Sequence, residues 1–186
     1  MTGIITQNTT RDSGLIKATA GASNAPFFFA RRGASGCSGD ACSNNFSDNS
    51  YVKAPFNNEV VDSDSCYDVS SYRFTPNVAG DYFFFCQTDI SGGTTDRLSS
   101  VYVDLRKNGT ITHGAYYSGE DQSSGYDRDY RYLANINAIV TMNGTSDYVE
   151  IYMKADESAS TPWFMGGTSG GYGNYNGSFF GGYKLA

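Results

Sequence analysis

The 186-residue chain has 15 tyrosines, 12 phenylalanines and 22 glycines, residue types that favour strands and tight turns, and it is long enough for one core but short for two. Its formal net charge of −6 repels nucleic-acid phosphates, and no segment is long and apolar enough to span a bilayer. We therefore expect a single all-β domain with neither nucleic acid nor a membrane as partner.

The N-terminal part of the chain differs from the rest. Residues 1–22 are polar, rich in Thr and Ala, and weakly patterned, so we expect an N-terminal arm or adaptor followed by one domain over residues 23–186. Residues 1–7 have neither the basic start nor the apolar run of a signal peptide. Export through the secretory pathway is therefore not indicated, and a virus component released by lysis needs no such signal.

The first predicted strands lie on either side of a polar loop. Residues 24–30 include three consecutive phenylalanines and form the first strand, whereas residues 33–50 are rich in Gly, Ser, Asn and Asp and form a loop. A strand pair is predicted over residues 51–61. Pro55 interrupts this pair, which indicates an edge or a bend because proline cannot donate a hydrogen bond to a strand ladder.

The strongest strand pattern covers residues 67–86. Tyr72 and Phe74 alternate with polar residues, a turn runs from Pro76 to Gly80, and an aromatic run follows over residues 82–85. This run is short and bounded by turn residues, as is typical of a buried strand.

A hairpin is predicted around Asn108-Gly109. Residues 99–106 alternate between apolar and other side chains, and residues 111–113 form the returning strand. The inward face of the first strand consists of Val101, Val103 and Leu105. The Asn-Gly dipeptide tolerates the positive φ angles of a type I′ turn, which links two antiparallel strands most tightly.

The same pattern returns around Asn143-Gly144, between predicted strands at residues 132–142 and 148–153. The inward residues are Ala134, Ile136, Ala138, Val140 and Met142 in the first strand and Val149, Ile151 and Met153 in the second. Residues 178–185 form the last strand. About eight to ten strands at short intervals in one domain predict a β-sandwich or jelly roll.

Aromatic residues are more numerous in these strands than one core can hold. Successive side chains of a strand point to opposite faces, so some aromatic rings must lie in another layer or in a contact with another chain. The residues that we expect in the core or in a subunit interface are Tyr82, Phe84, Tyr148, Tyr152, Phe179 and Tyr183.

The four cysteines leave several alternatives open. Cys37 and Cys42 lie in a Gly- and Ser-rich loop that would gain from a covalent link, and we consider a local disulfide between them. A zinc site is less favoured, because four ligands are needed and the single histidine, His113, is distant. Cys86 ends an aromatic strand and is expected to be a buried thiol.

The sequence offers little for catalysis. His113 follows the predicted hairpin turn, where a solvated histidine is the ordinary case, and the chain has no nucleophile elbow, phosphate-binding loop or zinc-protease motif. Asp62 with Asp64 and Asp127 with Asp129 could supply oxygen ligands to calcium. Neither pair matches a defined calcium loop, so solvated turns are favoured. We therefore expect no enzyme activity and no cofactor, with calcium as the alternative.

Two segments resemble the signature of the complement-one-q globular head, a relative of tumour necrosis factor. The first is Tyr67-Asp68, then Arg73-Phe74-Thr75-Pro76, then Gly80-Asp81-Tyr82-Phe83-Phe84, and the second is Ser178-Phe179-Phe180-Gly181-Gly182-Tyr183-Lys184-Leu185. The resemblance covers about residues 24–186. Tyr72 stands where that family usually has Gly, and residues 37–49 resemble an added loop. The resemblance implies a jelly roll of about ten strands that assembles as a tight homotrimer around aromatic residues.

Residues 3–18 resemble leader segments of structural proteins of tailed bacteriophages, some of which carry complement-one-q-like domains. This resemblance implies a virion protein, a trimeric capsid-decoration or fibre protein that residues 1–22 dock to other virion proteins. Its location would be the extracellular particle, assembled in the host cytoplasm.

The alternative is a module for host attachment that binds a receptor or a glycan, at a fibre tip or on a cell surface. Exposed tyrosines, Gly-rich loops and Trp163 would make the contacts. For Trp163 itself, a place in the core or in an interface is the favoured interpretation.

Overall fold

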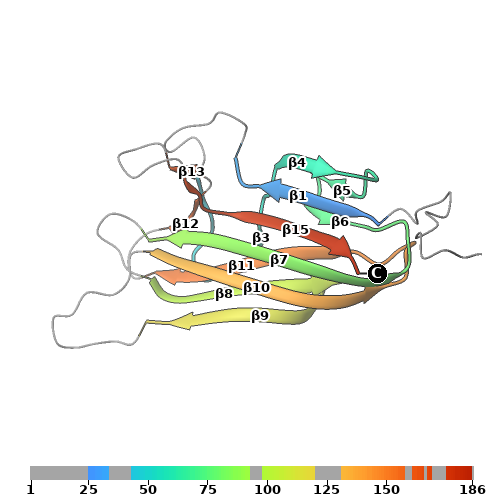
Figure 1. Cartoon of the computed structure of the whole chain (residues 1–186). Helices are drawn as coiled ribbons and strands as arrows, with labels where there is room; N and C mark the ends of the chain where they lie inside the picture. Colours follow the sequence, from blue (N-terminus) through green and yellow to red (C-terminus); the bar gives the residue numbers. More distant parts are fainter. Residues whose placement is uncertain are drawn as a thin grey trace, which may run out of the picture.

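The computed structural model describes residues 25–33, 43–92, 98–119, 131–157, 161–165, 167–168 and 175–185. Every element in these ranges is a strand (Figure 1). The strands are β1 Phe27–Arg31, β2 Ser43–Asn45, β3 Val52–Lys53, β4 Asn58–Asp62, β5 Tyr67–Asp68, β6 Arg73–Phe74, β7 Gly80–Ser91, β8 Leu98–Lys107, β9 Thr110–Ser118, β10 Arg131–Met142, β11 Val149–Glu157, β12 Trp163–Met165, β13 Gly167–Thr168, β14 Tyr175–Asn176 and β15 Phe179–Lys184. Among the described residues, no helix is long and apolar enough to cross a bilayer.

Two antiparallel sheets form a sandwich, as the sequence predicts. Sheet A has the order β2-β12-β7-β15-β1-β4, with β10 on the other side of β7. Sheet B has the order β5-β6-β11-β8-β9, with β3 also paired to β11. β13 and β14 form a separate two-stranded pair. Figure 1 shows the long strands of the two sheets as two layers.

The chain repeatedly passes from one sheet to the other, and this changes two sequence-based expectations. β10 and β11 flank Asn143-Gly144 but do not pair with each other, because β10 pairs with β7 in sheet A and β11 pairs with β8 in sheet B. The predicted strand pair at 51–61 is also divided, with β3 in sheet B and β4 at the edge of sheet A. Pro55 lies in the connection between them, which agrees with a bend.

The turn at Asn108-Gly109 is a hairpin, as predicted. Both residues have positive φ, 51° and 80°, and the turn joins β8 to β9, which pair along their length. The inward residues predicted for β8, β10 and β11 are all buried. Local alternation is therefore a reliable guide to the inward face of these strands.

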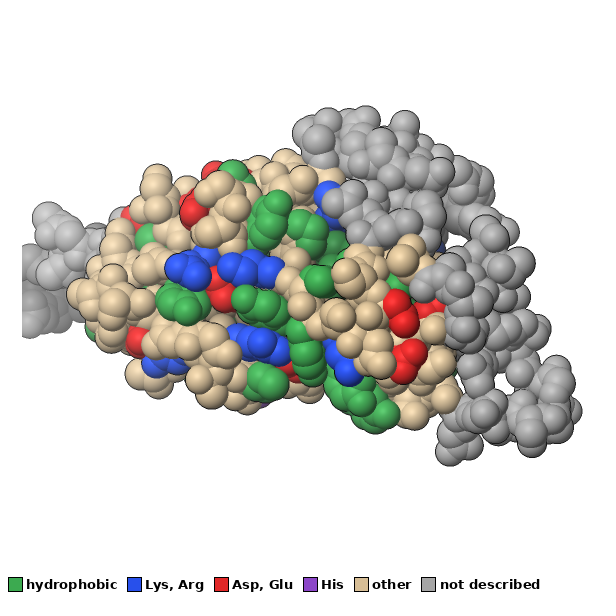
Figure 2. All heavy atoms as spheres, turned by 180° about the vertical axis from the view of Figure 1, so that it is seen from behind, with side chains coloured by type: hydrophobic (Ala, Val, Ile, Leu, Met, Phe, Trp, Pro, Cys, Tyr) green, Lys and Arg blue, Asp and Glu red, His purple; other side chains and the backbone are tan. Residues whose placement is uncertain are grey.

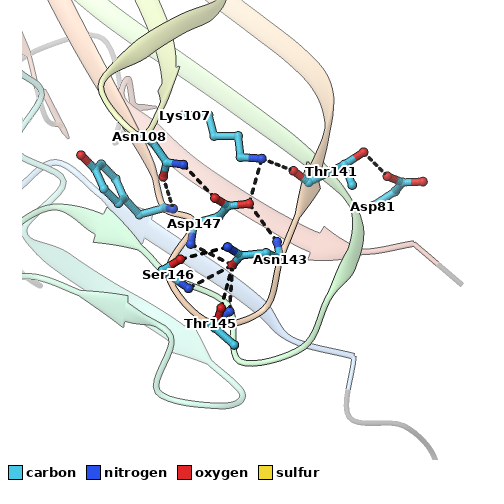
Figure 3. A network of polar contacts seen from close by, with 9 residues as sticks. Asp81, Lys107, Asn108, Thr141, Asn143, Thr145, Ser146 and Asp147 are labelled. Carbon is cyan, nitrogen blue, oxygen red and sulfur yellow. Dashed lines mark hydrogen bonds and ion pairs between the residues drawn. The ribbon is translucent and has the colours of Figure 1, made fainter.

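Asp147 and Asn143 connect the two turns at one end of the sandwich (Figure 3). The Asn143 Oδ1 atom accepts hydrogen bonds from the backbone N–H groups of residues 145–147, each at 2.9 Å. The Asp147 carboxylate accepts bonds from Lys107 Nζ at 2.8 Å and Asn108 Nδ2 at 2.7 Å. These donors, Lys107 first, lower the pKa of Asp147. The β8–β9 turn is thereby tied to the β10–β11 connection.

Aromatic rings dominate the core between the sheets. Phe28 stacks on Phe74 with ring centroids 4.4 Å apart and on Tyr67 at 4.9 Å, and it meets Phe180 edge-on at 4.8 Å. Each such pair adds about 0.5–1.5 kcal/mol beyond the burial of its area. The Tyr67 hydroxyl donates to the Phe56 carbonyl at 2.8 Å, so its polar atom is satisfied inside the core.

Several predicted features lie outside the described residues. These are the arm at 1–22, the Cys37–Cys42 pair, and Asp127 with Asp129. Cys86 is a buried free thiol, as expected, and so is Cys66. Burial is the first cause that raises the pKa of both thiols.

Candidate functional site

The outer face of sheet A has an unusual concentration of aromatic side chains. Along β7, Tyr82, Phe84 and Cys86 point into the core, so Phe83 and Phe85 point to the opposite face. We define the aromatic face as the outward side chains of β1, β7 and β15, namely Phe27, Phe29, Phe83, Phe85, Phe179 and Tyr183.

Strand register arranges these side chains in rows across the sheet. In the first row, Ile139 of β10 is opposite Phe83, Phe83 is opposite Tyr183, and Tyr183 is opposite Phe27. This row contains the most exposed side chains of the region: Tyr183 is 44% and Phe27 43% exposed, and Ile139, beside the aromatic face on β10, is 58% exposed. The row is apolar from β10 to β1.

In the second row, Gly181 lies between Phe85 and Phe29. A Cβ atom at Gly181 would collide with the Phe85 ring and would lie 3.0 Å from the Phe28 carbonyl oxygen. Because Gly181 has no side chain, the rings of Phe29 and Phe85 come within 6.1 Å of each other across β15. The Phe179 ring packs beside these two rings, with its centroid 6.2 Å from that of Phe85 and 5.7 Å from that of Phe29.

The face becomes polar towards its margins. The outward residues of β10 include Asn135 and Asn137, and the third row contains Gln87 and Arg31. The Arg31 guanidinium lies 5.2 Å from the centre of the Phe29 ring. An apolar centre with a polar rim is the arrangement found in protein–protein interfaces, and exposed apolar patches of this kind mark interaction sites.

The structure separates the six aromatic residues selected from the sequence. Tyr82 and Phe84 are fully buried in the core, whereas Phe179 and Tyr183 belong to the aromatic face. Tyr148 and Tyr152 lie on the side of sheet B. The centre of the Tyr148 ring is 3.8 Å from the Arg73 guanidinium, and the centre of the Tyr152 ring is 4.3 Å from the Arg106 guanidinium.

Sequence reasoning missed four members of the aromatic face. Phe27, Phe29, Phe83 and Phe85 were not selected, although each alternates with a residue that is buried: Phe28, Ala30 or Phe84. The sequence signal was the alternation of inward and outward positions along a strand, which runs such as residues 82–86 follow strictly. An uninterrupted aromatic run hides that alternation, because both faces carry the same residue type.

The remaining candidate residues have ordinary structural surroundings. His113 is exposed on β9, and the Asp62 carboxylate accepts bonds from the N–H groups of Asp64 at 3.3 Å and Tyr67 at 2.7 Å. Asp62 therefore stabilises the turn before β5. Trp163 lies in β12, which pairs with β2 and β7, and its side chain is outside the described part of the structure.

Comparison with known proteins supports the jelly-roll fold that the resemblance of the sequence implies. The chain is similar to the globular domain of zebrafish complement 1qA, with a TM-score of 0.50 and 16% identity over 87% of this chain and 98% of that chain. It is also similar to murine APRIL, with a TM-score of 0.53 and 11% identity over 87% and 99% of the two chains. The chain has a complement-one-q/tumour-necrosis-factor-like jelly-roll fold.

A third similar structure is Eiger TNF from S. frugiperda, with a TM-score of 0.50 and 15% identity over 87% of this chain and 92% of that one. No protein-family model matches the chain. At these identities the likeness concerns the fold.

Proposed function

We propose that this chain is a non-enzymatic structural protein that assembles as a homotrimer through the aromatic face of sheet A. The observation that carries the proposal is the apolar row of Ile139, Phe83, Tyr183 and Phe27, which exposes large side chains across four neighbouring strands of sheet A. Burying such side chains is the main favourable term in association. The resemblance to the complement-one-q head supports three copies around one axis.

We further propose that the trimer belongs to a bacteriophage virion, as a capsid-decoration or fibre protein docked by residues 1–22. The support is the resemblance of residues 3–18 to leader segments of phage structural proteins. Mass spectrometry of purified particles of the phage that encodes the chain tests this role. Peptides from the chain are expected in the particles, and their absence would contradict it.

The oligomeric state is tested by light scattering on the full chain and on the Ile139→Asp and Ile111→Asp variants. Ile139 is 58% exposed on the outer face of sheet A, and Ile111 is 53% exposed on β9 of sheet B, so the same substitution is compared at two similarly exposed positions. We expect three protomers for the wild type and Ile111→Asp, and monomers for Ile139→Asp. A monomeric wild type would refute the homotrimer, and equal effects of both substitutions would refute assembly through the aromatic face.

Removal of residues 1–22 separates assembly from docking. We expect the shortened chain to remain trimeric, because the aromatic face lies in the jelly roll, and to lose its attachment to particles. A shortened chain that becomes monomeric would show that the arm, and not the aromatic face, drives assembly.

A further inference from the structure

The outer face of sheet B alternates tyrosines with basic side chains. Figure 2 shows the molecule from behind, where blue Lys and Arg side chains lie directly beside green side chains. We define the tyrosine–cation face as Tyr51, Lys53, Arg73, Tyr102, Arg106, Tyr116, Tyr148, Tyr152 and Lys154. These residues come from β3, β6, β8, β9 and β11 and from the residues just before β3 and β11.

The rings and cations form one connected array. The Arg106 guanidinium lies between two rings, 4.3 Å from the centre of Tyr152 and 4.6 Å from that of Tyr51. Lys154 Nζ lies 5.3 Å from the centre of the Tyr102 ring. Tyr102 in turn lies 4.5 Å from Tyr116, its cross-strand neighbour on β9.

Two carboxylates of this face lie beneath its cations, whereas Asp156 on β11 is half-exposed and Asp68, opposite Arg73, is exposed. Glu150 has a side-chain exposure of only 3% and binds both Lys53, at 2.6 Å, and Arg73, at 2.8 Å, whose side chains are 25% and 37% exposed. Asp104 is 8% exposed and binds Arg106, which is 17% exposed. Because Lys53 and Arg73 share the one buried carboxylate of Glu150, this carboxylate neutralises only one of their two positive charges.

The outermost tyrosines are open to solvent. Tyr116 is 56% exposed and Tyr51 is 42% exposed. A tyrosine presents a flat apolar ring together with a hydroxyl that can donate and accept hydrogen bonds. Exposed rings beside fixed cations therefore suit a ligand that has apolar flat faces, hydroxyl groups and negative charges in the same short stretch.

We propose that the tyrosine–cation face binds an acidic oligosaccharide. The C–H faces of sugar rings would stack on Tyr116 and Tyr51, while carboxylate or sulfate groups would pair with Lys154 and Arg73. Arginine is well suited to bind such groups because its planar donors match two oxygen atoms at once.

The acidic character of the whole chain favours a short ligand over a long polyanion. Charges more than about 10 Å away are largely screened in physiological salt, so a short oligosaccharide responds to the local cations. A nucleic acid would extend over the acidic remainder of the surface. The face lies on sheet B, and the inference holds for a monomer and for a trimer alike.

The binding test uses the full chain and a short heparin fragment, measured by calorimetry. The variant Arg73→Gln/Lys154→Gln removes two cations, and Glu150 keeps Lys53 as its partner. Its control, Arg31→Gln/Lys184→Gln, removes the same charge from β1 and β15 of the other sheet. We expect the first variant to weaken binding by about tenfold, the combined effect of two solvent-accessible ion pairs, and the control to bind like the wild type. Circular dichroism verifies that both variants are folded.

The contribution of the rings is tested separately. Tyr116→Ala removes a stacking surface and is expected to weaken binding of the heparin fragment by about threefold to tenfold, whereas Tyr116→Phe retains the ring and most of the affinity. Equal losses in the two variants would contradict stacking on Tyr116.

Several outcomes would overturn the proposal. These are no binding of the heparin fragment, equal weakening by the two double variants, and equal affinity for an uncharged malto-oligosaccharide. Equal affinity for a single-stranded oligonucleotide of matched charge would assign the face to nucleic acid instead. A lower mass of Arg73→Gln/Lys154→Gln in light scattering would identify a second copy of the chain as the occupant. This variant leaves the aromatic face intact, so its result is distinguishable from failure of the trimer proposal.

Discussion

Phe84 and Phe85 are consecutive residues of β7, yet their rings lie on opposite faces of sheet A. The Phe84 ring is fully buried, 5.7 Å from the ring of Phe74 in sheet B. The Phe85 ring lies on the outer face, 6.1 Å from that of Phe29. Phe84 therefore stabilises the fold of the protomer, whereas Phe85 is available for assembly with other copies.

Substitution of the two residues by alanine should separate folding from assembly. Phe84→Ala leaves a cavity in the core and is expected to lower the free energy of unfolding of the protomer by about 3–5 kcal/mol. Phe85→Ala should cost the protomer less and instead lower the stability of the trimer. Urea unfolding over a range of protein concentrations measures both effects. Equal losses for the isolated protomer would contradict the assignment of the two faces.

Two glycines with positive φ should differ in their tolerance of alanine. Gly144 has φ +71°, and a Cβ there would collide with the backbone of Val78 and Ala79. Gly109 has φ +80° with nothing within 4 Å of the added atom. We expect Gly109→Ala to lower the free energy of unfolding by about 1 kcal/mol and Gly144→Ala by about 2–5 kcal/mol, because backbone must also move. Thermal or urea unfolding measures the difference, and similar losses would refute the close approach.

Tyr72 has φ 54°, and it stands where the complement-one-q family usually has glycine. A bulky residue in this left-handed conformation is strained by about 1–2 kcal/mol. We expect Tyr72→Gly to be more stable than Tyr72→Ala by about 1 kcal/mol, because both lose the ring but only glycine relieves the strain. Urea unfolding of the two variants tests this order, and a more stable alanine variant would contradict it.

The core should make the protein sensitive to alkaline pH. Burial raises the pKa of Tyr82 to about 12 from its ordinary value of 10.0, and burial also raises that of Cys86. The unfolded state loses these protons at lower pH than the folded state, so stability is constant below the ordinary values and falls as pH rises above them. For Tyr82 the fall is expected between pH 10.0 and about 12.

Urea unfolding at increasing pH tests this dependence, with Tyr82→Phe as the comparison. The variant lacks the titrating hydroxyl, which donates to the Val78 carbonyl at 2.7 Å. It should therefore start from a lower stability and show a shallower decline above pH 10.0. An unchanged slope would mean that Tyr82 is not a source of the alkaline dependence.

Local sequence determined the strand content, the Asn108-Gly109 hairpin and the inward faces of β8, β10 and β11. These properties depend on backbone preferences and on the alternation of neighbouring side chains, which act over a few residues. The resemblance of residues 67–84 and 178–185 to the complement-one-q signature added the jelly-roll fold, and structural comparison supports that fold.

Only the tertiary structure decided which strands share a sheet and which aromatic rings share a face. β10 and β11 follow one another in the chain but join opposite sheets. The aromatic face needs the register of β1, β7 and β15, and Glu150 meets partners that lie 77 and 97 residues away in the sequence. Such contacts depend on strand pairing and on the closure of a common core, which no short stretch of the chain specifies by itself.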